Sequence, residues 1–311
     1  MISKIPTLTM THDEWLRERK KGIGGSDAGA VLGLNPYKSA FDVYADKKSL
    51  TEPQADNEAM RQGRDLEDYV ARRFSEQTGK KVHRVNSIIY NSKYPFAFAN
   101  IDRAVQGEDA GLECKTTKCL NLKRYKNGDF PSEYYCQCMH YMMVTGYSKW
   151  YLAVLVYGAE FKVFEIERDE EEITALCRAE SNFWTNHIMK SKPPAPDGSK
   201  STDNVISAIY PQSDTHGITL EPLSDELKQL KDVKALILEY EKEKRRLEQS
   251  IKLYMKDCEE GITPEFQVTW RTQIRTSFDV DAVIKDYVPE GTDLSEYQKS
   301  TKYRVFKVKE R

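Results

Sequence analysis

The sequence predicts a mixed α/β protein, with a mixed sheet flanked by helices and a C-terminal extension of one long helix plus strands. Segments of helical and of strand periodicity alternate over residues 1–192. A stretch rich in proline, glycine and serine at residues 191–202 then interrupts the pattern. Past it, residues 223–258 carry apolar side chains at heptad spacing among many charges. We therefore predict a core domain over residues 1–192, a linker-like segment over 193–217 and an extension over 218–311.

The first predicted elements are helices separated by a glycine-rich turn. One helix begins at residues 11–13, carries Arg19 and ends at Gly22. The run G-I-G-G-S-D at residues 22–27 then predicts a tight turn, after which Ser26 or Asp27 caps a short helix. Such a turn is a ready anion site, to which Arg19 would add a bidentate phosphate contact. A plain turn with a helix cap explains the same residues, and both interpretations stay open.

Two further helices are predicted over residues 40–47 and 57–78. In the longer one, apolar residues spaced by three and four place Glu67 on the buried face. A carboxylate in an apolar stripe is costly unless a cation or a metal ion compensates it. Pairing with an arginine such as Arg64 and metal binding are both open for Glu67.

Strand patterns follow the long helix. Residues 81–90 and 96–101 are predicted as successive strands, and Asp102 ends the second. After a turn, residues 112–116 predict a short strand in which Glu113 and Lys115 face the same side. A hairpin would bring Asp102 beside them.

Two carboxylates and one ammonium at a sheet end suit metal-dependent phosphodiester hydrolysis. Carboxylate oxygens hold Mg²⁺, which keeps several of its waters and polarises the phosphate. The lysine orients or deprotonates the attacking water and offsets developing charge. A surface hairpin with an ordinary ion pair would carry the same short motif, so the rest of the chain has to decide between the two.

A basic loop, a helix, a hairpin and a second helix complete the predicted core, over residues 120–131, 133–145, 150–167 and 169–189. On the first of these helices, Gln137 and Tyr141 are four residues apart and share a face. The loop either follows a phosphate backbone or is simply solvated.

The extension is predicted to contain strands as well as its helix. The heptad pattern of the helix is broken at Lys244, and the helix either pairs with a partner or folds back. Residues 266–278 alternate as one strand, with which residues 303–309 would pair. Many basic residues lie here and either help to hold DNA or form a solvated face.

Bulk composition excludes several classes of protein. The net charge is −2, so nucleic-acid contact has to come from local patches. The six cysteines form no CxxC pair and are predicted to be reduced thiols. Neither a secretory signal nor an apolar run near the ~20 residues of a membrane span is present, which predicts an intracellular protein without membrane contact.

The order of these motifs resembles the PD-(D/E)xK nuclease superfamily, with its restriction-endonuclease-like core, in the recombination-exonuclease branch. The residues that carry the resemblance are Glu67, Asp102, Glu113-x-Lys115 and Gln137-x-x-x-Tyr141. W-x-x-x-R at residues 15–19, followed by G-I-G-G-S-D, narrows the resemblance to YqaJ-type phage recombinases, which are related to the exonuclease of phage lambda. It covers residues 10–190, and Ile101 replaces the proline of the family motif.

The resemblance implies a metal site. Asp102 and Glu113 would bind the catalytic Mg²⁺, helped by the backbone carbonyl of Cys114, and Glu67 would be a further acidic ligand. Mn²⁺ is expected to substitute for Mg²⁺.

The resemblance also assigns the remaining site residues. Lys115 would position or activate the water, and Gln137 and Tyr141 would steady the lysine or the substrate from the neighbouring helix. Arg19 and Ser26 match the positions that receive the terminal 5′-phosphate in the lambda-type enzyme.

The function that follows is a Mg²⁺-dependent 5′→3′ exonuclease on linear double-stranded DNA. No Walker motif is present, so ATP is not expected to be needed. Family resemblance implies a single-strand annealing protein as partner, a homotrimer, and a phage- or prophage-encoded protein in the bacterial cytoplasm. A structure- or site-specific endonuclease on the same fold, or a non-catalytic DNA-binding recombination protein, remains the alternative.

Overall fold

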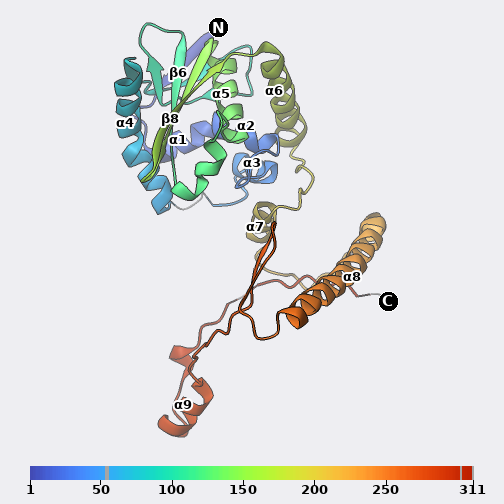
Figure 1. Ribbon diagram of the computed structural model, residues 1–311. Helices are drawn as coiled ribbons and strands as arrows, with labels where there is room; N and C mark the ends of the chain where they lie inside the picture. Colours follow the sequence, from blue (N-terminus) through green and yellow to red (C-terminus); the bar gives the residue numbers. More distant parts are fainter. Residues whose placement is uncertain (53–55, 302, 310–311) are drawn as a thin grey trace. The chain divides into compact units, whose positions relative to one another are not determined.

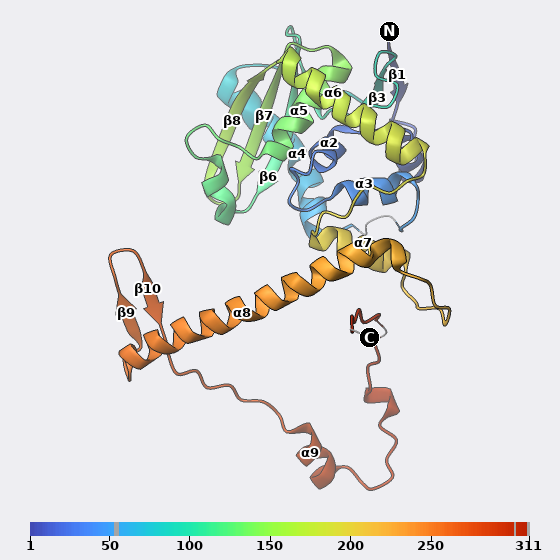
Figure 2. The same ribbon diagram turned by 90° about the vertical axis from the view of Figure 1, so that its right-hand side faces the viewer.

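A computed structural model describes residues 1–52, 56–301 and 303–309 of the chain. The chain divides into two compact units, Met1–Pro211 and Gln212–Arg311. The first contains a mixed sheet flanked by helices, and the second contains the long helix, as Figures 1 and 2 show. The predicted fold class is therefore confirmed.

The first unit extends past the predicted core domain. Helix α7 (Lys200–Ile209) lies within the segment predicted as a linker, but it packs on helix α3 (Ala40–Lys47). Ser201 Oγ donates to Asp42 Oδ2 at 2.7 Å, and Thr202 Oγ1 donates to Ser39 Oγ at 3.0 Å. These polar contacts tie the start of α7 to α3.

The main sheet has five strands in the order β2-β5-β6-β7-β8. Their bounds are Val82–Arg84, Arg103–Val105, Ala110–Thr117, Lys149–Val156 and Glu160–Glu167. Strands β6 and β7 are parallel and the other pairs are antiparallel. Parallel neighbours need a crossover, which here contains helix α5 (Ser132–Thr145).

Helices cover both faces of this sheet. Helix α4 (Glu58–Thr78) packs Phe74 against Tyr151 and Ala153 on one face. Helix α5 packs on the opposite face, where Trp150 and Leu152 lie in the larger core. Helix α6 (Glu170–Phe183) and the π-helical turn Trp184–Met189 continue that layer (Figure 2). In the parallel register Glu113 lies beside Leu152, so Glu113 and Lys115 belong to the α5 face.

Local signals account for the bounds of the two central helices. The side chain of Asn57 accepts a hydrogen bond from the Met60 amide, and Gly79 ends α4 in the left-handed conformation. Gly146 ends α5 in the same way, with φ 79°. Both helices match the predicted ones. Met60, the first apolar residue on the face of α4 that was predicted to be buried, is however 41% exposed.

The predicted strand over residues 81–90 is wrong in one respect, because the structure splits it between two sheets. Its first part is β2 of the main sheet, and its second part is β3 (Ser87–Asn91) of a separate three-stranded sheet. That sheet pairs β3 with β1 (Ile2–Pro6) and with β4 (Phe98–Ala99), which is shorter than the predicted strand over 96–101. One apolar run thus serves two sheets, which strand periodicity alone does not reveal.

Short helices complete the first unit. Helix α1 (His12–Arg19) begins with a capping box between Thr11 and Glu14. Helix α2 (Gly25–Val31) follows the glycine-rich turn, and α3 follows it. The segment predicted as a basic loop is partly a 3₁₀ helix, Cys119–Tyr125.

The second unit contains α8 (Ser224–Met255), a hairpin of β9 (Glu260–Ile262) and β10 (Gln267–Thr269), and α9 (Val280–Tyr287). The prediction of one strand over residues 266–278 is wrong beyond residue 269, and residues 303–309 form no strand. Among the described residues of this unit, only Met255 is buried. Alternation of apolar and polar residues therefore marks a strand here only where β9 offers a partner.

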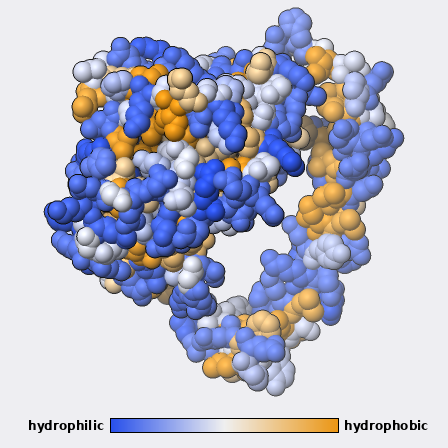
Figure 3. Space-filling model, turned by 90° about the horizontal axis from the view of Figure 1, so that it is seen from above, coloured by the Kyte–Doolittle hydropathy of each residue, from blue (hydrophilic) through white to orange (hydrophobic). Residues whose placement is uncertain are grey.

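On the face shown in Figure 3, hydrophilic residues predominate and hydrophobic residues gather in patches. In the part of the chain that the structure describes, no helix combines the length and the apolar character that a membrane crossing requires.

We predict that Gly111→Ala destabilises the first unit. Gly111 pairs with Trp150 across β6 and β7, and an added Cβ would overlap the buried indole ring. Overpacking of this kind costs about 1–3 kcal/mol, so thermal unfolding should show a lower midpoint.

The matched control is Gly63→Ala in α4, where an added Cβ meets only Thr116 Oγ1 at 4.0 Å. Alanine is the better helix former by about 0.5–1 kcal/mol, so this variant should be slightly stabilised. Equal midpoints for the two alanine variants would contradict the packing described for Gly111.

Candidate active site

The predicted hairpin brings Asp102 to Glu113 and Lys115. Strands β5 and β6 pair antiparallel, with Arg103 opposite Leu112. Asp102 precedes β5, and its Oδ2 accepts a hydrogen bond from the Cys114 amide at 2.9 Å. On β6, Lys115 Nζ lies 2.5 Å from Glu113 Oε1. The structure thus gathers the three residues at one end of the sheet.

Helix α5 adds the two predicted helix residues to this cluster. Gln137 Nε2 donates to Glu113 Oε1 at 2.7 Å and to the Tyr141 hydroxyl at 2.9 Å. Glu113 is only 3% exposed, and Gln137 and Tyr141 are buried as well. The amide and the ammonium therefore share one carboxylate oxygen and fix the orientation of the Glu113 side chain.

The cluster of Asp102, Glu113 and Lys115 contains a carboxylate oxygen that no described protein group contacts by a hydrogen bond. Glu113 Oε2 is buried and has no hydrogen-bond partner among the described residues. Burial, together with the nearby carboxylates of Glu113 and Glu67, raises the pKa of Asp102 well above its usual range. A buried aspartate whose ionised form is disfavoured, beside a glutamate with an unpartnered oxygen, makes a site suited to a cation.

Lys115 is held as an ammonium in this environment. Burial alone would favour the neutral amine, but the Glu113 carboxylate outweighs it and raises the pKa of Lys115. The ammonium also lies 4.9 Å from the centre of the Tyr134 ring.

Glu67 occupies a different position from the predicted one. It is partly exposed, at 28%, and it pairs with Arg103 at 2.5 Å. Arg64, the cation proposed for it from the sequence, pairs with Asp56 instead. The buried Arg103 also contacts Asp68 at 2.6 Å, so Glu67 shares its cation with a neighbouring carboxylate of α4.

The residues present fit a magnesium ion with two protein carboxylates. Among residues 1–52, 56–301 and 303–309, no three histidine, cysteine or acidic side chains gather closely enough to hold a metal ion. Mg²⁺, however, is usually bound through one or two carboxylates with several waters. The unpartnered Glu113 Oε2 is free to accept such an ion, and a bound cation would offset the burial and carboxylate repulsion that raise the pKa of Asp102. Cys114, whose carbonyl is the further predicted ligand, lies between Glu113 and Lys115 on β6.

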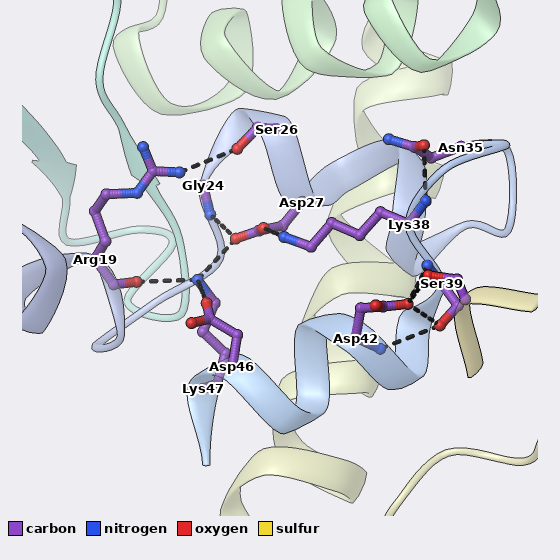
Figure 4. Close-up of polar contacts among 11 residues, drawn as sticks. Arg19, Gly24, Ser26, Asp27, Asn35, Lys38, Ser39, Asp42, Asp46 and Lys47 are labelled. Atoms are coloured by element: carbon purple, nitrogen blue, oxygen red, sulfur yellow. Dashed lines mark hydrogen bonds and ion pairs between the residues drawn. The ribbon is translucent and has the colours of Figure 1, made fainter. Parts of the chain in front are cut away.

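The two residues predicted to take a terminal phosphate are also together. Arg19 Nη2 donates to Ser26 Oγ at 3.1 Å (Figure 4). The guanidinium of Arg19 lies 4.5 Å from the centre of the Trp15 ring, and Trp15 Nε1 in turn donates to Asn100 Oδ1 at 2.8 Å. Stacking on an anchored indole fixes the direction of the Arg19 side chain.

Sequence reasoning missed the ion cluster behind this pair. Asp27 is 1% exposed and contacts Lys38 at 2.6 Å and Lys47 at 2.7 Å. Burial would raise the pKa of Asp27, but the lysines and Arg19 hold it well below its usual range. Lys47 ends a predicted helix, where a lysine is ordinarily solvated, so no local signal marks it as buried. The sequence indicates Asp27 only as a possible helix cap, whereas the N-cap of α2 is Gly24.

A close helix contact joins the two clusters. A Cβ on Gly25 would lie 2.5 Å from a ring carbon of Tyr141, so α2 rests directly on α5 at this point. The same tyrosine accepts the Gln137 hydrogen bond. Only glycine permits this approach, and the sequence signal for it is the glycine run at residues 22–25.

A mixed sheet presents an aspartate and a Glu-x-Lys motif from paired strands, with a glutamine on the crossover helix, in the arrangement that the sequence motifs predicted. The model of the YqaJ-like viral recombinase domain matches residues 14–148. The YqaJ protein of Bacillus subtilis (strain 168) is 38% identical over 306 residues, which cover 97% of this chain and 95% of that protein. The chain belongs to the YqaJ-like viral recombinase family, as the motifs predicted.

Two more distant similarities accompany this relationship. Protein D345L of African swine fever virus (strain Badajoz 1971 Vero-adapted) is 50% identical over 38 residues, 12% of this chain and 11% of the viral protein. The crystal structure of an alkaline exonuclease, LHK-Exo, from Laribacter hongkongensis aligns with a TM-score of 0.48 at 21% identity. That alignment covers 57% of this chain and 93% of the exonuclease.

We predict that Asp102→Asn stabilises the folded protein at pH 8 in the absence of divalent cations. The pKa of Asp102 is raised by folding, so its ionised form is less favourable in the folded chain than in the unfolded one. That cost exists only above about pH 4, the ordinary pKa of an aspartate. Thermal unfolding should show a gain of about 2–4 °C at pH 8 and none near pH 4.

Asp68→Asn is the matched control. A hydrogen bond from Arg84 lowers the pKa of Asp68, so the ionised carboxylate is favourable in the folded protein. Replacing Asp68 by asparagine should therefore not stabilise the protein. A midpoint of Asp102→Asn at or below that of the wild type at pH 8 would contradict the electrostatic strain assigned to Asp102.

Proposed function

We propose that this protein is a metal-dependent exonuclease that degrades linear double-stranded DNA from 5′-phosphorylated ends in the 5′→3′ direction. Mg²⁺ is the proposed cofactor, with Mn²⁺ as a substitute, and ATP is not required. The observation that carries the proposal is the buried, unpartnered Glu113 Oε2 beside Asp102 and Lys115. Membership in a viral recombinase family supports a role in DNA recombination.

Asp102 and Glu113 are the proposed ligands of the metal ion. When bound, Mg²⁺ would polarise the scissile phosphate and lower the pKa of an attacking water. Glu67 would add negative charge from the edge of the site, where Arg103 holds it.

Lys115 and Gln137 act on the reacting groups and on Glu113. Both donate to Glu113 Oε1, which leaves Oε2 as the oxygen available for a metal ion. Because its pKa is raised, Lys115 carries a positive charge, and it can orient the water and offset charge that develops on the phosphate. Tyr141 supports Gln137 through its hydroxyl.

Arg19 and Ser26 are the proposed ligands of the terminal 5′-phosphate. Guanidinium groups bind phosphate through two parallel N–H donors, and Trp15 already holds this one in place. Recognition of an end favours an exonuclease over an endonuclease on the same fold.

The basic segment after β6 can supply contacts to the DNA backbone, but not with all of its charges. Arg124 is committed to the buried Glu133, at 2.9 Å. Lys118, Lys123 and Lys126 remain as candidates for phosphate contacts, which would contribute sequence-independent, salt-dependent affinity.

Lys115→Ala is predicted to abolish most hydrolysis. The wild-type protein should shorten linear DNA in Mg²⁺ and not in EDTA, because the carboxylates require a cation. Removal of one preorganised donor typically costs about 10²–10³-fold in rate. The measurement is the initial rate of nucleotide release from linear duplex.

Lys162→Ala is the control, since Lys162 lies on β8 and pairs with Glu160. It should retain the wild-type rate. Hydrolysis by Lys115→Ala at that same rate would exclude Lys115 from the reaction, and absence of Mg²⁺-dependent cleavage by the wild-type protein would leave a DNA-binding role.

Arg19→Gln is predicted to remove the preference for phosphorylated ends. The variant should act on 5′-phosphorylated duplex no faster than on 5′-hydroxyl duplex, while its rate on 5′-hydroxyl ends stays close to wild type. Competition between the two duplexes measures the preference. A preference retained by Arg19→Gln would place the phosphate elsewhere.

A further inference from the structure

We propose that Lys38 is an additional ligand of the terminal phosphate, and that with Arg19 it makes the site selective for a doubly charged phosphate monoester. The inference rests on the proposed function, because it concerns the same DNA end. It assigns a specificity role to the ion cluster around Asp27 shown in Figure 4.

The cluster contains more positive than negative charge. Lys38 and Lys47 contact the carboxylate of Asp27, and Arg19, which donates to the adjacent Ser26, lies close enough to lower the pKa of that carboxyl. Three positive charges and one negative charge leave a net charge of +2. Asp46 reaches Lys47 only at 3.7 Å and is 46% exposed, so solvent screens most of its effect. Concentrated charge of one sign beside a buried group is costly unless a counter-ion is expected there.

Lys47 is a positioning residue. Its side chain is 1% exposed, and its ammonium binds Asp27 Oδ2 at 2.7 Å and donates to the backbone carbonyl of Arg19 at 3.0 Å. Asp27 in turn accepts from the Gly24 amide at 3.1 Å. Lys47 therefore neutralises Asp27 and fixes the turn that carries Arg19, and it has no access to a ligand in solvent.

Lys38 differs from Lys47 in access and in available donors. Its side chain is 32% exposed, and Asp27 Oδ1, at 2.6 Å, accepts one hydrogen bond from its ammonium. An ammonium has three N–H donors, so Lys38 can bind a phosphate oxygen without releasing Asp27. Its backbone is anchored as well, because the Lys38 amide donates to Asn35 Oδ1 at 3.1 Å.

The charge of the cluster matches a DNA terminus better than a DNA interior. A phosphate monoester carries about −1.5 to −2 charges at pH 7, whereas each internal phosphodiester carries about −1. With Asp27 neutralised by Lys47, the cations left for a ligand are Arg19 and Lys38. The two positive charges of Arg19 and Lys38 balance a doubly charged terminal phosphate, whereas a singly charged internal phosphodiester would leave one positive charge unbalanced.

A purely structural role for Lys38 is the competing explanation. Asp27 already has Lys47 and the Gly24 amide as partners, so it does not need a second ammonium to be ionised while buried. A structural lysine would affect all DNA ends equally, and a phosphate ligand would affect only phosphorylated ends.

The test is equilibrium binding of the full-length protein to three blunt duplexes that differ only at the 5′ end. The ends are a phosphate, a hydroxyl and a methyl phosphate, the last being a singly charged diester. EDTA is present throughout, so binding is read without cleavage, and a failure here is distinguishable from a failure of hydrolysis in Mg²⁺. The proteins are wild type, Lys38→Gln, Lys38→Arg and the control Lys48→Gln, whose lysine donates to Ser191 instead.

We expect wild type to prefer the phosphate over both other ends, and Lys38→Gln to lose about tenfold of that preference, as for one charge-assisted hydrogen bond. Lys38→Arg and Lys48→Gln should retain it, and binding to the hydroxyl end should be unchanged in all four. A wild-type protein that does not distinguish phosphate from methyl phosphate would overturn the proposal. Equal loss of affinity for all three ends in Lys38→Gln would also overturn it, and would assign Lys38 the structural role.

Discussion

The hydrogen bonds to Glu113 Oε1 are the interaction on which the rest of the site depends. They come from Lys115 on the same strand and from Gln137 on α5, so one carboxylate oxygen joins the sheet to its crossover helix. The other oxygen stays buried without a protein partner. An arrangement that satisfies one oxygen and isolates the other, beside Asp102 with its raised pKa, fits a cation site.

The contact between helices α2 and α5 joins the carboxylate cluster to the pair formed by Arg19 and Ser26. Gln137 is supported by Tyr141, and Gly25 allows α2 to rest on the tyrosine ring. The turn before α2 positions Arg19 and Ser26, and buried Asp27 and Lys47 hold that turn. Side-chain packing and buried ion pairs therefore place the proposed phosphate ligands relative to the carboxylates.

Much of the fold and most of the site follow from local sequence patterns, and the exceptions have physical reasons. The caps of α4 and α5 and the two-residue spacing of Glu113 and Lys115 are local signals, so they predict structure well. The division of residues 81–90 between two sheets depends on which distant strands pair with them. The partner of Glu67 is Arg103, which is remote in sequence from α4, and the burial of Lys47 depends on Asp27 from another helix. The periodicity of a local sequence segment does not reveal which distant segments it will contact.

The most direct measurement of end-dependent hydrolysis follows a label on the 5′-terminal nucleotide of a linear duplex in Mg²⁺, beside covalently closed circular DNA. If Asp102, Glu113 and Lys115 act on DNA held by its terminal phosphate, the label is released first, as a mononucleotide, and the circles stay intact. Retention of the label while the opposite end shortens, or cutting of the circles, would contradict 5′→3′ degradation from a recognised end.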